Sequence, residues 1–242
     1  MPADMPSLSR AQMVEVDRLM IEVYGIALIQ MMENAGLRLA ELARQLLGGS
    51  VAGKQLAVLC GAGGNGGGGM AAARHLSNWG ASVSVVLAAD PNNLCGAPAQ
   101  QWRSLLALRL IDAPPPEPSS PDLILDALIG YGLTGSPRGE ARRWIEWSLA
   151  SPAPVLALDV PSGLDVDRGE PSSPTVRAAA TLTLALPKIG LRQPQARPFV
   201  GALHLADIGV PPALYQHLGL QVGPLFARQA ILRLDEAGFP GS

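Results

Sequence analysis

Two aspartates that end apolar runs are the first candidates for chemistry. Asp126 stands near the end of the run 122–128, and Asp159 near the end of the run 154–160. Burial of a carboxylate costs free energy unless the group is paired or binds a metal. Each is therefore a candidate for proton transfer or ligand binding, although Asp126 is alternatively a residue that caps a loop. Ser162 follows Asp159 in a Pro-Ser-Gly turn and is placed to face the same cleft.

A glycine-rich segment, residues 61–69, follows the apolar run 55–60 and holds seven glycines in nine residues. Such a backbone reaches conformations and close approaches that side chains forbid, and its N–H groups at a helix start favour an anion. Gly61, Gly63 and Gly66 satisfy the dinucleotide-binding pattern, with Asp90 placed as a ribose-binding acid. So many glycines satisfy many patterns, and a tight turn without a ligand is the alternative.

Other polar residues give weaker indications. Lys188 follows a further apolar run and either meets an anion or faces solvent, whereas Asp165 and Asp167 fit turn geometry. The histidines lack partners at metal-ligand spacing, which disfavours zinc. Cys60 is expected in the core, and two cysteines cannot form a disulfide framework, so a reducing, cytoplasmic location is expected.

The elements that position these residues alternate along the chain. Two helices, 9–23 and 26–47, precede the first strand, and Ser9 with Gln12 forms a capping box. Continuous apolar runs separated by helical segments indicate a parallel sheet covered on both faces. We predict an α/β fold, a three-layer αβα Rossmann-like sandwich with a mostly parallel central sheet and two extra N-terminal helices. The expected strands are 55–60, 82–88, 122–128, 154–160, 181–186 and 201–206, and the later helices are 70–79, 97–108, 139–149 and 212–218.

Composition bounds the function. The chain has 242 residues, a net charge of −2, 16% charged and 48% hydrophobic residues. This composition predicts one large folded domain over 1–242. The absence of a basic run disfavours nucleic-acid binding, and the absence of a long apolar run disfavours a membrane span.

Taken together, these motifs resemble the NAD(P)H-hydrate epimerase family, the YjeF N-terminal domain, over about Ala11 to Leu218. The resemblance rests on 32–36 (Met-Glu-Asn-Ala-Gly), the glycine segment, Asp126 with its following Gly-x-Gly, and 159–165 (Asp-Val-Pro-Ser-Gly-Leu-Asp). Pro-Lys-x-Gly-Leu at 187–191 and Ala-Asp-Ile-Gly-Val-Pro at 206–211 complete it.

The resemblance implies a metabolite-repair isomerase that interconverts the R and S epimers of hydrated NADH and NADPH at carbon 6 of the nicotinamide ring. It implies Asp159 as the proton-handling residue and a potassium ion held by Asn65, Asp126 and Ser162. A homodimer and a partner NAD(P)H-hydrate dehydratase, fused in some relatives, are also implied. The implied substrate contacts are Gly64, Asn65, Gly66, Gly67, Gly68, Gly130, Tyr131, Gly132, Leu133, Thr134, Gly135, Ser136 and Asp159.

One departure leaves alternatives open. The family segment usually reads Gly-Asn-Asn-Gly-Gly-Asp-Gly, but here Gly64 replaces the first Asn and Gly68 replaces the Asp. Loss of a charged hydrogen-bond partner typically costs about 1.5–3 kcal/mol. The alternatives to an epimerase are therefore a catalytically degenerate member that binds a nucleotide-like ligand or serves as an interaction module, and an ordinary NAD-dependent dehydrogenase. A dehydrogenase is disfavoured because it gives Asp126 and Asp159 no role.

Overall fold

A seven-stranded sheet organises the molecule, and the computed structural model describes residues 5–111 and 121–234. The strand order is β2-β1-β3-β4-β5-β6-β7, parallel throughout except for β7, which pairs antiparallel with β6. The strands are β1 (Gln55–Cys60), β2 (Ser82–Leu87), β3 (Leu123–Ala127), β4 (Val155–Leu158), β5 (Ala180–Leu184), β6 (Ala202–Ala206) and β7 (Ile231–Arg233).

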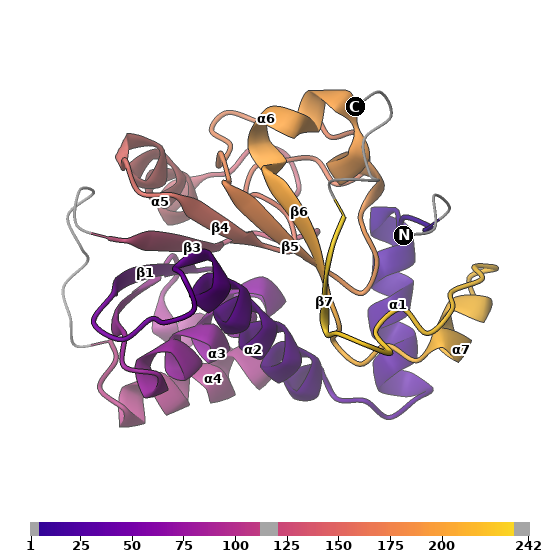
Figure 1. Cartoon of the computed structure of the whole chain (residues 1–242), viewed down its shortest axis with the longest axis horizontal. Coiled ribbons are helices and arrows are strands. Elements are labelled where there is room, and N and C mark those ends of the chain that lie inside the picture. Colours follow the sequence, from indigo (N-terminus) through magenta and orange to yellow (C-terminus); the bar gives the residue numbers. More distant parts are fainter. Residues whose placement is uncertain (1–4, 112–120, 235–242) are drawn as a thin grey trace.

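Helices cover both faces of this sheet, and Figure 1 shows α2, α3 and α4 below it and α5 and α6 above it. The first helix, α1, stands beside β7 and α7 in the same view. The predicted three-layer sandwich is thereby confirmed. The helices are α1 (Arg10–Glu22), α2 (Leu28–Leu46), α3 (Gly64–Asn78), α4 (Gly96–Ala107), α5 (Gly139–Ala150), α6 (Arg197–Val200) and α7 (Pro212–Gln216).

The two N-terminal helices are present, and α1 begins at the predicted capping box of Ser9 and Gln12. The second helix is not an appendage, because its apolar face (Leu39, Ala40, Leu42 and Ala43) is buried in a cluster with β1, β3 and α3. In the part of the chain that the structure describes, no helix is long and apolar enough to cross a bilayer.

The predicted start of the third helix at residue 70 is wrong, because α3 begins six residues earlier, at Gly64. Glycine is a poor helix former, yet packing requires it here. A Cβ on Gly36 of α2 would lie 2.4 Å from the Ala71 Cβ and 2.7 Å from the Gly68 carbonyl oxygen. On the α3 side, a Cβ at Gly67 would lie 2.6 Å from the Met32 sulfur. Gly36 and Gly67 therefore let α2 and α3 pack at close range, and tertiary contact overrides the local propensity.

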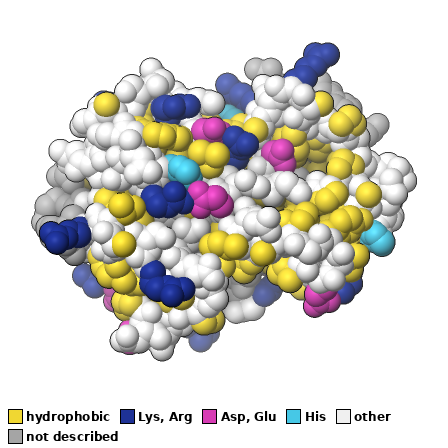
Figure 2. Space-filling view, turned by 90° about the horizontal axis from the view of Figure 1, so that it is seen from below, with side chains coloured by type: hydrophobic (Ala, Val, Ile, Leu, Met, Phe, Trp, Pro, Cys, Tyr) yellow, Lys and Arg dark blue, Asp and Glu magenta, His cyan; other side chains and the backbone are white. Residues whose placement is uncertain are grey.

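The face seen in Figure 2 shows hydrophobic side chains interspersed with charged ones of both signs. An ion-pair cluster links α2 to α3, since Arg74 Nη2 lies 2.6 Å from a Glu33 carboxylate oxygen and His75 Nε2 lies 2.8 Å from the other. Burial on its own would raise the pKa of Glu33, but the hydrogen bonds from Arg74 and His75 outweigh this effect, and the pKa is lowered. The Glu of the Met-Glu-Asn-Ala-Gly motif thus joins two helices.

We expect Gly66→Ala to destabilise the fold strongly, because the added Cβ would lie 1.8 Å from the Gly61 carbonyl oxygen. Overpacking of this kind costs about 1–3 kcal/mol or more. Urea unfolding followed by circular dichroism measures the change. Gly64→Ala is the matched control, since its Cβ meets only a Met32 methyl at 3.9 Å. Equal stability of the two variants would contradict the close approach.

Candidate functional site

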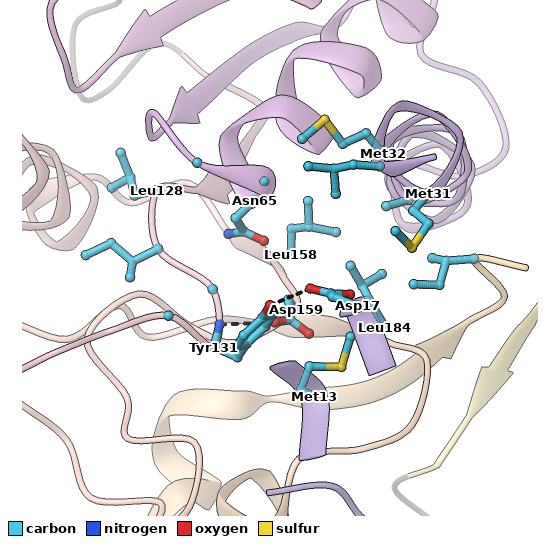
Figure 3. A pocket seen from close by; sticks show the side chains of 18 residues that line it. Met13, Asp17, Met31, Met32, Asn65, Leu128, Tyr131, Leu158, Asp159 and Leu184 are labelled. Atoms are coloured by element: carbon cyan, nitrogen blue, oxygen red, sulfur yellow. Dashed lines mark hydrogen bonds between the residues drawn. The ribbon is translucent and has the colours of Figure 1, made fainter. Parts of the chain in front are cut away.

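A cavity of about 460 Å³ opens at the carboxyl ends of β1, β3 and β4. The chain leaves β1 to form β2 on one side and later forms β3 on the other side. The loops after β1 and β3 therefore diverge, and such a switch point is where open α/β sheets bind ligands. Figure 3 shows the cavity between these loops, with side chains of α1 and α2 along its other side.

Asp159 stands directly after β4 and lines the polar part of the cavity. Its φ of +67° is rare for a residue with a side chain, although Asp tolerates this region better than most. Backbone strain of this kind persists where the surroundings fix it, and it clusters at functional sites. The predicted position of Asp159 at the cleft is consistent with this geometry.

Lys188 resolves the choice left open by the sequence, because it is fully buried and forms an ion pair with Asp159. Its ammonium donates to an Asp159 carboxylate oxygen and, at 2.8 Å, to the Leu184 carbonyl oxygen. The interpretation of Lys188 as a solvent-facing residue is therefore wrong. A buried ion pair of this kind needs such additional hydrogen bonds to offset desolvation.

Gly130 separates Asn65 from Asp159 at the polar end of the cavity. A Cβ at Gly130 would lie 3.2 Å from Asn65 Oδ1 and 3.2 Å from Asp159 Oδ2. The absence of a side chain therefore lets an amide and a carboxylate flank one backbone position. The Nδ2 atom of Asn65 is buried without a hydrogen-bond partner among the described residues, which leaves this amide available to a ligand of the cavity.

Asp126 and Ser162 form a buried pair just behind the cavity. The Ser162 hydroxyl donates to Asp126 Oδ1 at 2.6 Å, and the Ser162 N–H donates to Asp126 Oδ2 at 2.8 Å. Burial raises the pKa of Asp126 to about 6, against the opposing hydrogen bonds from Ser162. Asp126 also accepts from the Leu128 N–H at 3.2 Å, so the loop-capping alternative describes part of its role.

The donors predicted for potassium fit a hard cation in their chemistry, because Asn65, Asp126 and Ser162 offer amide, carboxylate and hydroxyl oxygens. Ser162 and Asn65 belong to different elements, yet both lie next to the short segment 129–130 after β3. Ser162 Oγ accepts from the Ile129 N–H at 2.9 Å, and Asn65 Oδ1 adjoins Gly130. Among the described residues no cluster of three His, Cys, Asp or Glu side chains is present.

Part of the glycine segment lines the cavity and part of it is buried in α3. Gly64 and Asn65 line the cavity, but Gly66, Gly67 and Gly68 do not; all three are buried in the first turns of α3. A Cβ at Gly68 would lie 2.9 Å from the Leu158 Cδ2 atom. Space beside Gly68 is thus occupied by Leu158, whereas Gly64 borders open space.

The loop after β3 is divided in the same way. Gly130, Tyr131 and Gly132 line the cavity, and the remaining predicted contacts of this loop, Leu133, Thr134, Gly135 and Ser136, do not. Arg10 of α1 donates to the carbonyl oxygens of Leu133 at 3.1 Å and Gly132 at 3.3 Å. The loop is therefore tied to the N-terminal helix.

Asp17 of α1 is a site residue that the sequence analysis missed. It lines the cavity and accepts a hydrogen bond from the Tyr131 hydroxyl (Figure 3). Burial raises the pKa of Asp17, against the hydrogen bond from Tyr131. The sequence offers one indication of this site: an acidic residue lies beside the apolar positions Met13, Val16 and Met20 of an amphipathic helix.

Apolar side chains form the rest of the cavity, as Figure 3 shows for its methionines and leucines. They come from α1, α2, the ends of β4 and β5 and the segment after β6, so the cavity has one polar and one apolar end. Most ligand pockets combine apolar walls with a few placed polar groups. The apolar lining includes Met13, Met31, Met32, Leu158, Leu184 and Ile208.

The remaining candidates lie outside the cavity lining. Asp90 caps a short 3-10 helix and accepts from the Asn92 N–H at 2.9 Å, so the dinucleotide interpretation loses its ribose acid. Asp165 accepts from the N–H groups of Asp167 and Arg168, which confirms its predicted turn role. Asp167 instead accepts from the Arg10 N–H at the start of α1, at 2.8 Å. Cys60 is buried in the core as predicted, and burial raises its pKa.

A mostly parallel sheet with an acid-bearing cavity at its switch point defines a Rossmann-like α/β ligand-binding protein. The YjeF-related protein N-terminus family model matches residues 28–190. An NAD(P)H-hydrate epimerase of Dehalogenimonas lykanthroporepellens is 47% identical over 86% of this chain and 84% of its own length. The chain therefore belongs to the YjeF N-terminal, NAD(P)H-hydrate epimerase family, a family of isomerases.

Other relatives differ in length. An NAD(P)H-hydrate epimerase of Rhodopirellula baltica is 35% identical over 89% of both chains. A bifunctional NAD(P)H-hydrate repair enzyme of Moorella thermoacetica is 34% identical, and this chain covers 47% of it. The chain thus spans less than half of the bifunctional relative. The crystal structure of yeast YNL200c shares the fold, with a TM-score of 0.81 at 21% identity over 95% of this chain and 100% of that one.

Proposed function

We propose that this protein is an isomerase that interconverts the R and S epimers of hydrated NADH and NADPH. One observation carries the proposal: the 47%-identical relative, which matches this chain over most of both lengths, is named NAD(P)H-hydrate epimerase. The cavity supports it, since it offers a buried acid at a strand end and an apolar wall for a ring. Its volume of about 460 Å³ lies within the usual range of small-molecule sites.

Epimerisation at carbon 6 requires that a C–O bond breaks and re-forms on the opposite face of the ring. In the hydroxide-loss route, the leaving oxygen takes up a proton and departs as water, which leaves a ring cation. Water then adds to the other face and releases a proton, so no net proton is consumed. Asp159 lines the cavity and shares a hydrogen bond with the Lys188 ammonium. We assign the giving and taking of this proton to that pair.

An epimer-exchange assay tests the function. R-enriched hydrated NADH is mixed with the protein in potassium buffer, and the R/S ratio is followed by chromatography against the spontaneous reaction. Acceleration that scales with protein concentration supports the epimerase. No acceleration at high protein concentration would overturn it.

A catalytically degenerate, ligand-binding member is the second candidate, and the replacement of family Asn and Asp by Gly64 and Gly68 favours it. Gly64 borders open space, so the Cβ of Gly64→Asn meets only a Met32 methyl at 3.9 Å. Gly68→Asp requires Leu158 to move, because its Cβ would lie 2.9 Å from that side chain. If the natural protein is inactive and Gly64→Asn restores turnover, the degenerate interpretation holds.

Potassium is proposed as the cation of Asn65, Asp126 and Ser162, and when bound it would supply a fixed positive charge beside the substrate. We expect potassium, compared with tetramethylammonium at equal ionic strength, to raise the melting temperature of the wild-type protein. A ligand that binds only the folded state stabilises by mass action, by about 2.7 kcal/mol at one hundred times its dissociation constant. Thermal unfolding in the two salts measures the difference.

Asp126→Asn is the test variant for this cation, because it removes the charge and keeps the shape of the side chain. We expect it to lose the potassium-dependent shift, while Asp122→Asn, at the opposite end of β3, keeps it. A shift that survives in Asp126→Asn would place the cation elsewhere.

We also propose a homodimer and a functional partnership with an NAD(P)H-hydrate dehydratase in the cytoplasm. Exposed apolar side chains on α1 and at its C-cap, Val14 at 52%, Ile21 at 45% and Val23 at 57%, offer contact area for a second copy. The bifunctional repair enzymes among the relatives support the partnership, since this chain matches only part of each. Light scattering measures the oligomeric state.

A further inference from the structure

Helix α1 forms one side of the cavity, although it lies outside residues 28–190, the segment that the family model matches. Met13 and Asp17, one helical turn apart, both line the cavity. The two have different surroundings, because Met13 belongs to the buried cluster that docks the helix whereas Asp17 meets a loop. α1 therefore contributes a polar group to the site in addition to apolar packing.

Tyr131 connects Asp17 to the catalytic candidate Asp159. Its hydroxyl donates to Asp17 Oδ2, and its backbone N–H donates to Asp159 Oδ2 at 3.2 Å. Figure 3 shows both hydrogen bonds meeting at this one residue. A single residue, through its hydroxyl and its backbone N–H, thus joins an N-terminal helix to an acid that follows it by more than a hundred residues.

The Asp17 contact is not needed to dock the helix. The buried residues Met13, Val16, Leu19 and Met20 already hold α1 in an apolar cluster, and Arg10 ties its first turn to the loop. A half-buried carboxylate adds a desolvation cost to that packing. Instead, the hydrogen bond that Asp17 accepts from the Tyr131 hydroxyl contacts the residue whose backbone N–H donates to Asp159.

We propose that Asp17 is a positioning residue that acts through Tyr131 to fix residues 130–132 and to orient the Asp159 carboxylate toward the cavity. The catalytic consequence rests on the proposed epimerase function, but the effect on the loop does not. Misplacement of a catalytic group by about 1 Å can cost about a hundredfold in rate. Loss of the hydrogen bond is therefore expected to lower turnover while the helix stays docked.

Hydrogen exchange tests the structural part without any substrate. In Asp17→Ala, we expect the amides of residues 130–136 to exchange at least about tenfold faster, while the α1 amides keep their protection. Glu22→Gln is the matched control, because Glu22 lies on the same helix and its carboxylate pairs with the exposed Arg18. Unchanged exchange of the loop in Asp17→Ala would overturn the proposal.

Kinetics in the epimer-exchange assay test the catalytic part. We expect kcat of Asp17→Ala to fall about ten- to a hundredfold with a smaller change in KM, and Asp17→Asn, which keeps an oxygen acceptor for Tyr131, to recover most of it. Tyr131→Phe should match Asp17→Ala, and the double variant should be no worse than either, because the two act as one unit.

The two failures are distinguishable. If the wild-type protein shows no turnover, the proposed function fails and the exchange experiment still decides whether Asp17 fixes the loop. If wild-type turnover is present and Asp17→Asn is as slow as Asp17→Ala, the charge of Asp17 matters rather than its acceptor geometry, and the positioning role is overturned. Additive losses in the double variant would overturn it as well.

Discussion

Lys188→Met is expected to lower the free energy of unfolding by about 3–5 kcal/mol, because removing one partner of a buried ion pair leaves the other charge uncompensated. Lys188 has no exposed side-chain surface and Asp159 has only 4%. Methionine keeps the length and most of the volume of lysine, so a cavity contributes little to the loss. Urea unfolding, extrapolated to water, measures the change.

Two further variants separate the charge effect from packing. Asp159→Asn combined with Lys188→Met removes both charges, and we expect the double variant to regain most of the lost stability. Lys54→Met is the matched lysine control, because its pair with Asp122 is 42% and 36% exposed and is expected to matter far less. A Lys188→Met loss no larger than that of Lys54→Met would contradict the importance of the buried pair.

The sheet and its strand ends could be predicted from the sequence because burial on both faces leaves continuous apolar runs. Asp126 and Asp159 are visible for the same reason, as charges that interrupt such runs. The short edge strand β7, three residues long, carries no such pattern and was missed. Its pairing depends on where β6 leaves an open edge, which is a property of the assembled sheet.

The glycine segment and Lys188 show what sequence reasoning cannot resolve. Helix propensity predicts a turn at 64–69, but those residues are helical. Close neighbours from α2, from the strand ends and from the Gly61 backbone leave no room for a Cβ at residues 66–69. The sequence shows that a lysine follows a predicted strand, but its burial depends on which strand ends pack around it in the folded protein. Asp17 and Tyr131 meet only because α1 folds back over the cavity, and no local pattern encodes that contact.

Asp159→Asn is expected to lower turnover by about 10²–10⁴-fold, the usual contribution of a general acid–base group. Asparagine keeps the shape of the side chain and its acceptor oxygen for the Tyr131 N–H, but its amide is too weak a base to take up a proton. The variant also leaves the buried Lys188 ammonium without its carboxylate. A loss of stability is therefore expected too, and the epimer-exchange assay must be run well below the melting temperature.

Two controls assign the lost turnover to chemistry rather than to unfolding. Leu105→Ala, at a fully buried position of α4 away from the cavity, is expected to cost about 2–5 kcal/mol and to keep near wild-type kcat. The charge-free double variant, Asp159→Asn with Lys188→Met, is expected to be stable and still inactive. If Asp159→Asn turned over at the wild-type rate, proton handling would have to lie elsewhere in the cavity. Because Asp17 is a second carboxylate lining it, equal inactivity of Asp17→Asn in that case would move the acid–base role to α1.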